Sequence, residues 1–105
     1  MNFTKHMMKE RLDRAGFILS HVSLGHSVAE QLVQEPGKKD CVRVLTNTGI
    51  ILVYTANKEK VITIYLASIA QAKVFYPTGS RLPNGVYKAV KENARLLKLC
   101  QEMGL

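Results

Sequence analysis

Residues 41–66 read CVRVLTNTGIILVYTANKEKVITIYL, and this stretch decides the fold. Three runs rich in β-branched and aromatic residues are separated by two short polar connections, at 47–49 and 57–60, with the composition of hairpin turns. The stretch therefore predicts an antiparallel meander with strands at 41–46, 50–55 and 61–66. The middle run is apolar at consecutive positions, so we expect both of its faces to be covered.

The outer strands of this meander carry polar side chains. Because side chains alternate between the two faces of a strand, Val61, Thr63 and Tyr65 are expected to point one way and the aliphatic residues between them the other. Arg43, on the first strand, rises from a partly apolar surface. If pairing brings Arg43 onto the face of Tyr65, a small concave cluster of Arg, Thr and Tyr results. Ordinary half-exposed strand positions are the alternative, because the sequence does not fix the register.

The residues before the meander predict two helices. Thr4 can cap the first, which is expected to end at Gly16. Ser27 opens a capping-box pattern, Ser-Val-Ala-Glu, for a second helix that stops at Pro36-Gly37. Residues 17–24 between them are apolar and are either extended or a short helical turn.

The first predicted helix carries charged residues in a regular arrangement. His6, Glu10 and Arg14 form a ridge at four-residue spacing. Arg11 projects into the apolar face, where it either reaches back to water or lines a cleft between helix and sheet. The positive end of the helix around His6 favours the neutral imidazole, which is the form that accepts a proton.

Two further helices are expected after the meander. Ser68 opens a second capping box and a short helix that stops at Pro77, with a fourth strand at 72–76 as the alternative. A long helix follows from about residue 85 to residue 103 and ends at Gly104. Four cations stand in one row on this helix, where they either track phosphates or form a solvated face. They are Lys88, Lys91, Arg95 and Lys98.

These elements predict one α+β domain over residues 1–105, with two N-terminal helices, a three- to four-stranded antiparallel meander, a short helix and a long C-terminal helix. Cys41 and Cys100 match no metal or redox spacing, so we expect reduced thiols and neither a metal nor another cofactor. No apolar run approaches the about 20 residues of a membrane span, and the first residues lack a signal-peptide core. The sequence predicts a cytoplasmic protein with no membrane partner.

The charge balance favours a polyanionic partner. Fifteen Lys and Arg against eight Asp and Glu give a net charge of +7. Nucleic acid is the first candidate, ahead of an acidic protein or a membrane surface. The alternative is a basic protein that binds no polyanion.

Three short motifs add a resemblance to a known family. They are Phe3-Thr4-Lys5-His6, Arg14 with Gly16-Phe17, and Val61-Ile62-Thr63-Ile64-Tyr65. Together, over roughly residues 3–66, they resemble a family of small uncharacterised domains in phage-related and toxin-related bacterial proteins, which is grouped with ribonucleases of the RelE and barnase type. The resemblance implies two helices against an antiparallel sheet, metal-independent RNA cleavage, and an antitoxin or immunity protein as partner. The family has an arginine four residues after the histidine, whereas this chain has Glu10 there and Arg11 one place later.

RNA cleavage without a metal needs a base for the 2′-hydroxyl proton, cations on the phosphate and an acid for the leaving oxygen. The candidate catalytic residues are His6 as base, Arg11 and Arg43 as phosphate clamps, Tyr65 as proton donor and Thr63 as a hydrogen-bonding hydroxyl. Arg14 and the four cations of the C-terminal helix are the candidate nucleic-acid-binding residues. The alternative functions are a non-catalytic nucleic-acid-binding protein and a phage accessory interaction protein.

Overall fold

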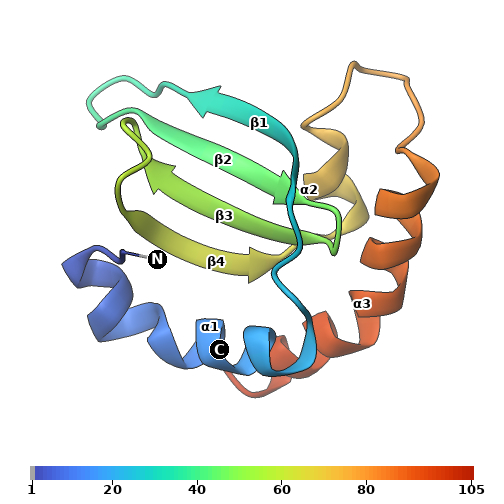
Figure 1. Cartoon of the computed structure of the whole chain (residues 1–105), viewed down its shortest axis with the longest axis horizontal. Coiled ribbons are helices and arrows are strands. Elements are labelled where there is room, and N and C mark those ends of the chain that lie inside the picture. Colours follow the sequence, from blue (N-terminus) through green and yellow to red (C-terminus); the bar gives the residue numbers. More distant parts are fainter. Residues whose placement is uncertain (1) are drawn as a thin grey trace.

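The computed structural model describes residues 2–105, apart from the side chains of Glu10 and Arg11. Its centre is a four-stranded antiparallel sheet in the order β1-β2-β3-β4 (Figure 1). The strands are β1 (Ser27–Val33), β2 (Cys41–Thr46), β3 (Ile50–Thr55) and β4 (Val61–Leu66). The predicted meander is therefore confirmed, with all three strands at the expected bounds. β3 lies between β2 and β4, and its residues from Ile50 to Val53 are buried, as expected for a strand covered on both faces.

The helix predicted at 27–33 is wrong, because these residues form β1. β1 pairs antiparallel with β2, from Val33 opposite Cys41 to Ser27 opposite Thr46. Partly buried and exposed residues alternate along most of β1, which is the two-residue period of a strand with one covered face. The capping-box pattern is a short local signal, and pairing with the edge of β2 outweighs it. β1, rather than residues 72–76, is thus the fourth strand.

The N-terminal helical region consists of two consecutive elements, the π-helix η1 (Met7–Arg11) and α1 (Leu12–His21). The count of two N-terminal helices agrees roughly with the prediction, but their positions differ. Thr4 caps the start as expected, since its Oγ1 accepts a hydrogen bond from the Met7 N–H over 3.2 Å. The helix continues through Gly16 because Ile18, which is 1% exposed, packs in the core.

Both C-terminal helices are confirmed: α2 (Ile69–Lys73) and α3 (Asn84–Glu102). The capping box of α2 is complete. The Gln71 N–H donates to Ser68 Oγ over 3.1 Å, and the Ser68 N–H donates to Gln71 Oε1 over 2.9 Å. No helix within residues 2–105 is long and apolar enough to cross a membrane.

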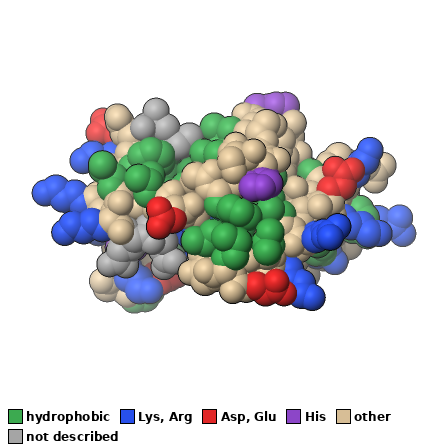
Figure 2. Space-filling view, turned by 90° about the horizontal axis from the view of Figure 1, so that it is seen from below, with side chains coloured by type: hydrophobic (Ala, Val, Ile, Leu, Met, Phe, Trp, Pro, Cys, Tyr) green, Lys and Arg blue, Asp and Glu red, His purple; other side chains and the backbone are tan. Residues whose placement is uncertain are grey.

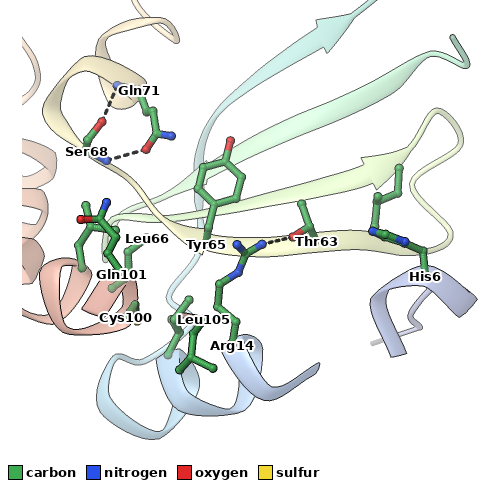
Figure 3. A pocket seen from close by; sticks show the side chains of 13 residues that line it. His6, Arg14, Thr63, Tyr65, Leu66, Ser68, Gln71, Cys100, Gln101 and Leu105 are labelled. Atoms are coloured by element: carbon green, nitrogen blue, oxygen red, sulfur yellow. Dashed lines mark hydrogen bonds between the residues drawn. The ribbon is translucent and has the colours of Figure 1, made fainter. Parts of the chain in front are cut away.

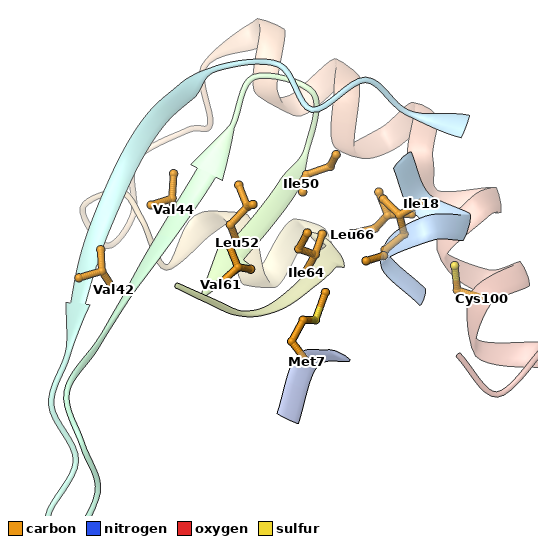
Figure 4. Close-up of a cluster of buried hydrophobic side chains, with 11 residues drawn as sticks. Met7, Ile18, Val42, Val44, Ile50, Leu52, Val61, Ile64, Leu66 and Cys100 are labelled. Carbon is orange, nitrogen blue, oxygen red and sulfur yellow. The ribbon is translucent and has the colours of Figure 1, made fainter. Parts of the chain in front are cut away.

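The core lies on both faces of the sheet. On one face, residues of η1, α1 and the C-terminal end of α3 pack on the strands (Figure 4). On the other face, α2 and the beginning of α3 cover Leu45 and Ile51 through Ala72, Val86 and Val90. Toward the Cys41 end of β2 the second face is only partly covered, and this is where the polar side chains lie.

A β-bulge in β4 changes the expected alternation of side chains. Val53 pairs with Thr63 and Tyr54 pairs with Val61, so Ile62 is an extra residue. Val61 consequently lies in the first core cluster, whereas Ile62 packs on the second together with Tyr65. The prediction that Val61 shares the face of Thr63 and Tyr65 is therefore wrong, because the strand is not regular at this point.

Candidate functional site

Strand register places Arg43, Thr63 and Tyr65 on one face of the sheet. Arg43 lies opposite Val53, and Val53 lies opposite Thr63, so the three residues form one row across β2, β3 and β4. Directly paired residues point to the same face, and Tyr65 is two positions beyond Thr63. The structure thus supplies the register that the sequence left open.

Arg14 extends from α1 to the outer edge of β4. Its Nε donates to the Ile64 carbonyl oxygen over 3.0 Å, and its Nη2 donates to Thr63 Oγ1 over 2.5 Å. The guanidinium carbon lies 6.0 Å from the centre of the Tyr65 ring. Figure 3 shows the guanidinium between Thr63 and Tyr65. Two bonds from one planar group fix its orientation, so a cation is held in place beside the phenol.

A pocket of about 540 Å³, here called the edge hollow, runs along this side of β4. Arg14, Thr63 and Tyr65 line it. His6 lies at one end of the hollow and Ser68, at the start of α2, at the other (Figure 3). The remaining lining residues are Ile18, Ile62, Leu66, Gln71, Leu97, Cys100, Gln101 and Leu105.

A second pocket has a volume of about 270 Å³ and is here called the lysine pocket. Arg43 lines it, and Tyr65 lines both this pocket and the edge hollow. Glu35, Lys38 and Lys39 line it as well. Lys38 Nζ lies 3.0 Å from Glu35 Oε2, and the hydrogen bond and charge of Lys38, together with the charge of Arg43, lower the pKa of Glu35. Three cations against one carboxylate leave this pocket positive.

Tyr65 is partly buried between two arginines. Burial raises the pKa of its phenol above the usual value of 10.0, although the charges of Arg43 and Arg14 act in the opposite direction. Burial therefore outweighs the two cations, so the phenol keeps its proton to a higher pH than a free tyrosine does. Such a group donates a hydrogen bond or a proton to an anion that the arginines attract.

The structure brings most of the predicted catalytic residues to these two adjoining pockets. Thr63 and Tyr65 lie beside Arg14, with His6 on the wall of the edge hollow and Arg43 in the lysine pocket. The side chain of Arg11 lies outside the described residues. Arg14, predicted only to bind nucleic acid, lies in the centre of the site.

Sequence reasoning missed Lys39 as a neighbour of Arg43. The two-residue alternation of β2, continued backward from Arg43 through Cys41, reaches Lys39 and was a usable signal. The sequence predicts a helix cap at Ser68 but gives no signal that Ser68 and Gln71 line the edge hollow.

The predicted cation row on α3 is exposed along its whole length: Lys88, Lys91, Arg95 and Lys98. Lys91 and Lys98 line a groove of about 220 Å³ that also contains Ser68 and Gln101. Since Ser68 and Gln101 also line the edge hollow, this groove adjoins the hollow. Figure 2, viewed from the α1 side of Figure 1, shows hydrophobic patches on that face with Lys and Arg toward both ends.

The thiols of Cys41 and Cys100 are free. Burial raises the pKa of Cys100, so this residue remains a thiol at neutral pH. Among residues whose side chains are described, no three His, Cys, Asp or Glu gather closely enough to hold a metal ion. No protein-family model, curated protein or solved structure matches the chain.

Proposed function

We propose that this chain is a metal-independent RNA-cleaving domain of toxin type, the activity that its resemblance to RelE- and barnase-type ribonucleases implies. The observation that supports the proposal is the position of the Tyr65 phenol, which lies beside the fixed guanidinium of Arg14 and lines one pocket together with Arg43. Arg43 donates no side-chain hydrogen bond within the described residues, so its planar fork can donate two parallel bonds to phosphate oxygens. Arg14 donates to Thr63 and Ile64 and therefore contributes mainly a positive charge at a fixed position.

In this reaction the 2′-hydroxyl oxygen of RNA attacks the adjacent phosphorus while the bond to the 5′-oxygen breaks. The products are a 2′,3′-cyclic phosphate and a free 5′-hydroxyl. His6 accepts the 2′ proton, and Tyr65 donates a proton to the leaving oxygen. His6 and Tyr65 lie on either side of Thr63 in Figure 3, an arrangement that suits an acid and a base acting on opposite sides of one phosphate. Arg43 and Arg14 offset the charge that develops on phosphorus.

The proposal includes RNA as substrate, a cytoplasmic location, and an antitoxin or immunity protein as inhibitor. An inhibitor of this kind would cover the Tyr65 face, because blocking the phosphate site is sufficient to stop the reaction.

The test is incubation of the purified protein with total RNA in excess EDTA, comparing the parent with Tyr65→Phe. Phenylalanine keeps the ring but removes the proton donor, so cleavage is expected to slow about a hundredfold or more. Tyr54→Phe is the matched control, because Tyr54 is also partly buried but packs on the other face of the sheet. The new 3′ ends of the RNA fragments should carry 2′,3′-cyclic phosphates. An intact RNA pool with the parent protein would overturn the proposal.

Binding of nucleic acid without cleavage is the second candidate function. The exposure of all four cations of the α3 row favours it, as does the position of Lys91 and Lys98 in the groove that adjoins the edge hollow. A shift of RNA mobility that salt abolishes, with no cleaved product, would support this candidate against the first.

A further inference from the structure

A pocket of about 890 Å³ lies between α2, the loop at 74–83 and the first turn of α3. In Figure 1 this loop stands out at the upper right, away from α1. Tyr76 and Tyr87 contribute aromatic rings to the wall, and Lys73 and Arg81 contribute charge. We call it the tyrosine pocket. α2 separates it from the edge hollow, since Ser68 lines the hollow while Lys73 lines the pocket.

The two tyrosine rings are available to a ligand to different extents. Tyr76 is partly buried and packs against the second core cluster. Tyr87 is 46% exposed and packs in neither core cluster. The ammonium nitrogen of Lys91 lies over this ring, 5.8 Å from its centre. Tyr87 therefore presents an exposed aromatic ring that the packing of the core does not require, and such a ring can stack on a base.

The charge around the tyrosine pocket is entirely positive. Lys73 and Arg81 line it, Lys91 lies over the Tyr87 ring, and no Asp or Glu is among the lining residues. Thr78 and Ser80 add hydroxyl groups, and the Ser80 hydroxyl donates to the Pro77 carbonyl oxygen over 2.5 Å, so its oxygen can still accept a hydrogen bond. A ligand for this pocket therefore combines a flat aromatic group, hydrogen-bonding edges and negative charge.

We propose that the tyrosine pocket binds one unpaired nucleotide of RNA, with the base stacked on Tyr87 and the phosphate between Arg81 and Lys73. Stacking on aromatic side chains with cations along the backbone is the usual way in which proteins hold single-stranded nucleic acid. The choice of RNA rests on the proposed function, whereas the pocket itself is separate from the residues assigned to cleavage. The edge hollow and the tyrosine pocket lie on either side of α2, so one substrate strand would have to cross α2 to contact both.

The test is the affinity for a fluorescein-labelled ten-nucleotide 2′-O-methyl RNA, which lacks the attacking hydroxyl and cannot be cleaved. Fluorescence anisotropy gives the dissociation constant. Tyr87→Ala is expected to weaken binding about fivefold or more, and Tyr87→Phe to preserve it, because the stacking surface remains. Arg81→Ala should lower the slope of log affinity against log salt by about 0.7, whereas the remote Lys60→Ala should leave the affinity unchanged. Thermal unfolding verifies that each variant folds.

Equal affinities of the parent and Tyr87→Ala would overturn the inference. Tyr65→Phe separates this inference from the proposed function, since it removes the proposed acid but leaves the tyrosine pocket intact. A parent protein that binds through Tyr87 and fails to cleave RNA would overturn only the proposed function. Competition with uridine monophosphate tests whether the pocket prefers a nucleotide within RNA or a free nucleotide. If uridine monophosphate binds as tightly as the ten-nucleotide RNA, the ligand is a free nucleotide and the assignment to RNA is wrong.

Discussion

The guanidinium of Arg14 and the hydroxyl of Thr63 form a hydrogen bond of 2.5 Å between residues 49 positions apart in the chain. Together with the bond from Arg14 Nε to the Ile64 carbonyl oxygen, it joins α1 to the outer edge of β4. A carbonyl at a sheet edge has no partner strand, so Arg14 satisfies it while holding positive charge beside Tyr65.

Thr63→Val should lower the free energy of unfolding by about 1.5–3 kcal/mol, because valine keeps the shape but leaves the cation without its hydroxyl partner. Urea unfolding measures the change. Thr78→Val is the control, since Thr78 is exposed in the loop before α3 and lies far from Arg14 in the chain. Equal losses in the two variants would show that the bond to Arg14 contributes nothing to stability.

Arg43→Ala should slow RNA cleavage about a hundredfold or more, since losing one charged contact to the transition state costs about 3 kcal/mol. Folding should persist, because no hydrogen bond within the described residues uses the Arg43 side chain. The rate is measured with a labelled RNA in EDTA. Arg43→Lys should restore part of the rate, because it returns the charge without the planar fork. Comparable rates for Arg43→Ala and the remote Lys60→Ala would remove Arg43 from the mechanism.

The meander could be predicted from the sequence because its signals are local. Hairpin composition at 47–49 and 57–60 and dense β-branched runs place all three strands at the bounds found. The capping box at Ser68 is equally local and was recognised. Such features depend on neighbouring residues, so no knowledge of the tertiary fold was needed.

Other features depend on contacts between distant segments. β1 exists because β2 offers it an edge, and the Ser-Val-Ala-Glu pattern fits both a helix and a strand. The site depends on register and on the reach of Arg14 across β4, neither of which a single sequence encodes in a readable way. The residue types of the candidate site were therefore predictable from chemistry, but their arrangement was not.

Stability should fall at alkaline pH. Burial raises the pKa of Tyr65, Tyr76 and Cys100, so the folded state keeps protons that the unfolded chain releases. Their contribution to the free energy of unfolding is complete below the ordinary pKa values of 9.0 for Cys and 10.0 for Tyr. It is lost as the pH rises through the higher pKa values of the folded state. Urea unfolding between about pH 8 and 11 measures this loss. Tyr65→Phe should show a smaller decrease than Tyr54→Phe, and identical decreases would contradict the burial argument.

Gly49→Ala should destabilise the protein more than Gly37→Ala. Both glycines have positive φ, 84° and 77°, which costs an alanine about 1–2 kcal/mol. At Gly49 a Cβ would also lie 2.9 Å from Asn93 Nδ2, which donates to the Thr48 carbonyl oxygen over 2.7 Å, whereas nothing lies within 4 Å at Gly37. The added contact would disturb the hydrogen bond that joins α3 to the β2–β3 turn. Equal unfolding midpoints for the two variants would exclude this effect.

Replacing Lys91 and Lys98 by alanine should lower the slope of log RNA affinity against log salt by about 1.4, since each phosphate contact to a single strand contributes about 0.7. These two cations line the groove that adjoins the edge hollow. Mobility shifts at increasing salt give the slope. The double variant of Lys9 and Lys60 removes the same charge from residues that line neither the groove nor the hollow, so an equal decrease there would indicate only a general charge effect.

The extra residue in β4 predicts that this strand tolerates the loss of one residue at the bulge. Deleting Ile62 would let Val61 and Thr63 keep their partners Tyr54 and Val53 in a regular ladder, so Tyr65 would still face the lysine pocket. Deleting a residue between Thr63 and Tyr65 would instead turn the phenol toward the opposite core, because a shift of one position exchanges the two faces. Homologous chains that are one residue shorter here can therefore retain the site only if the gap falls at the bulge.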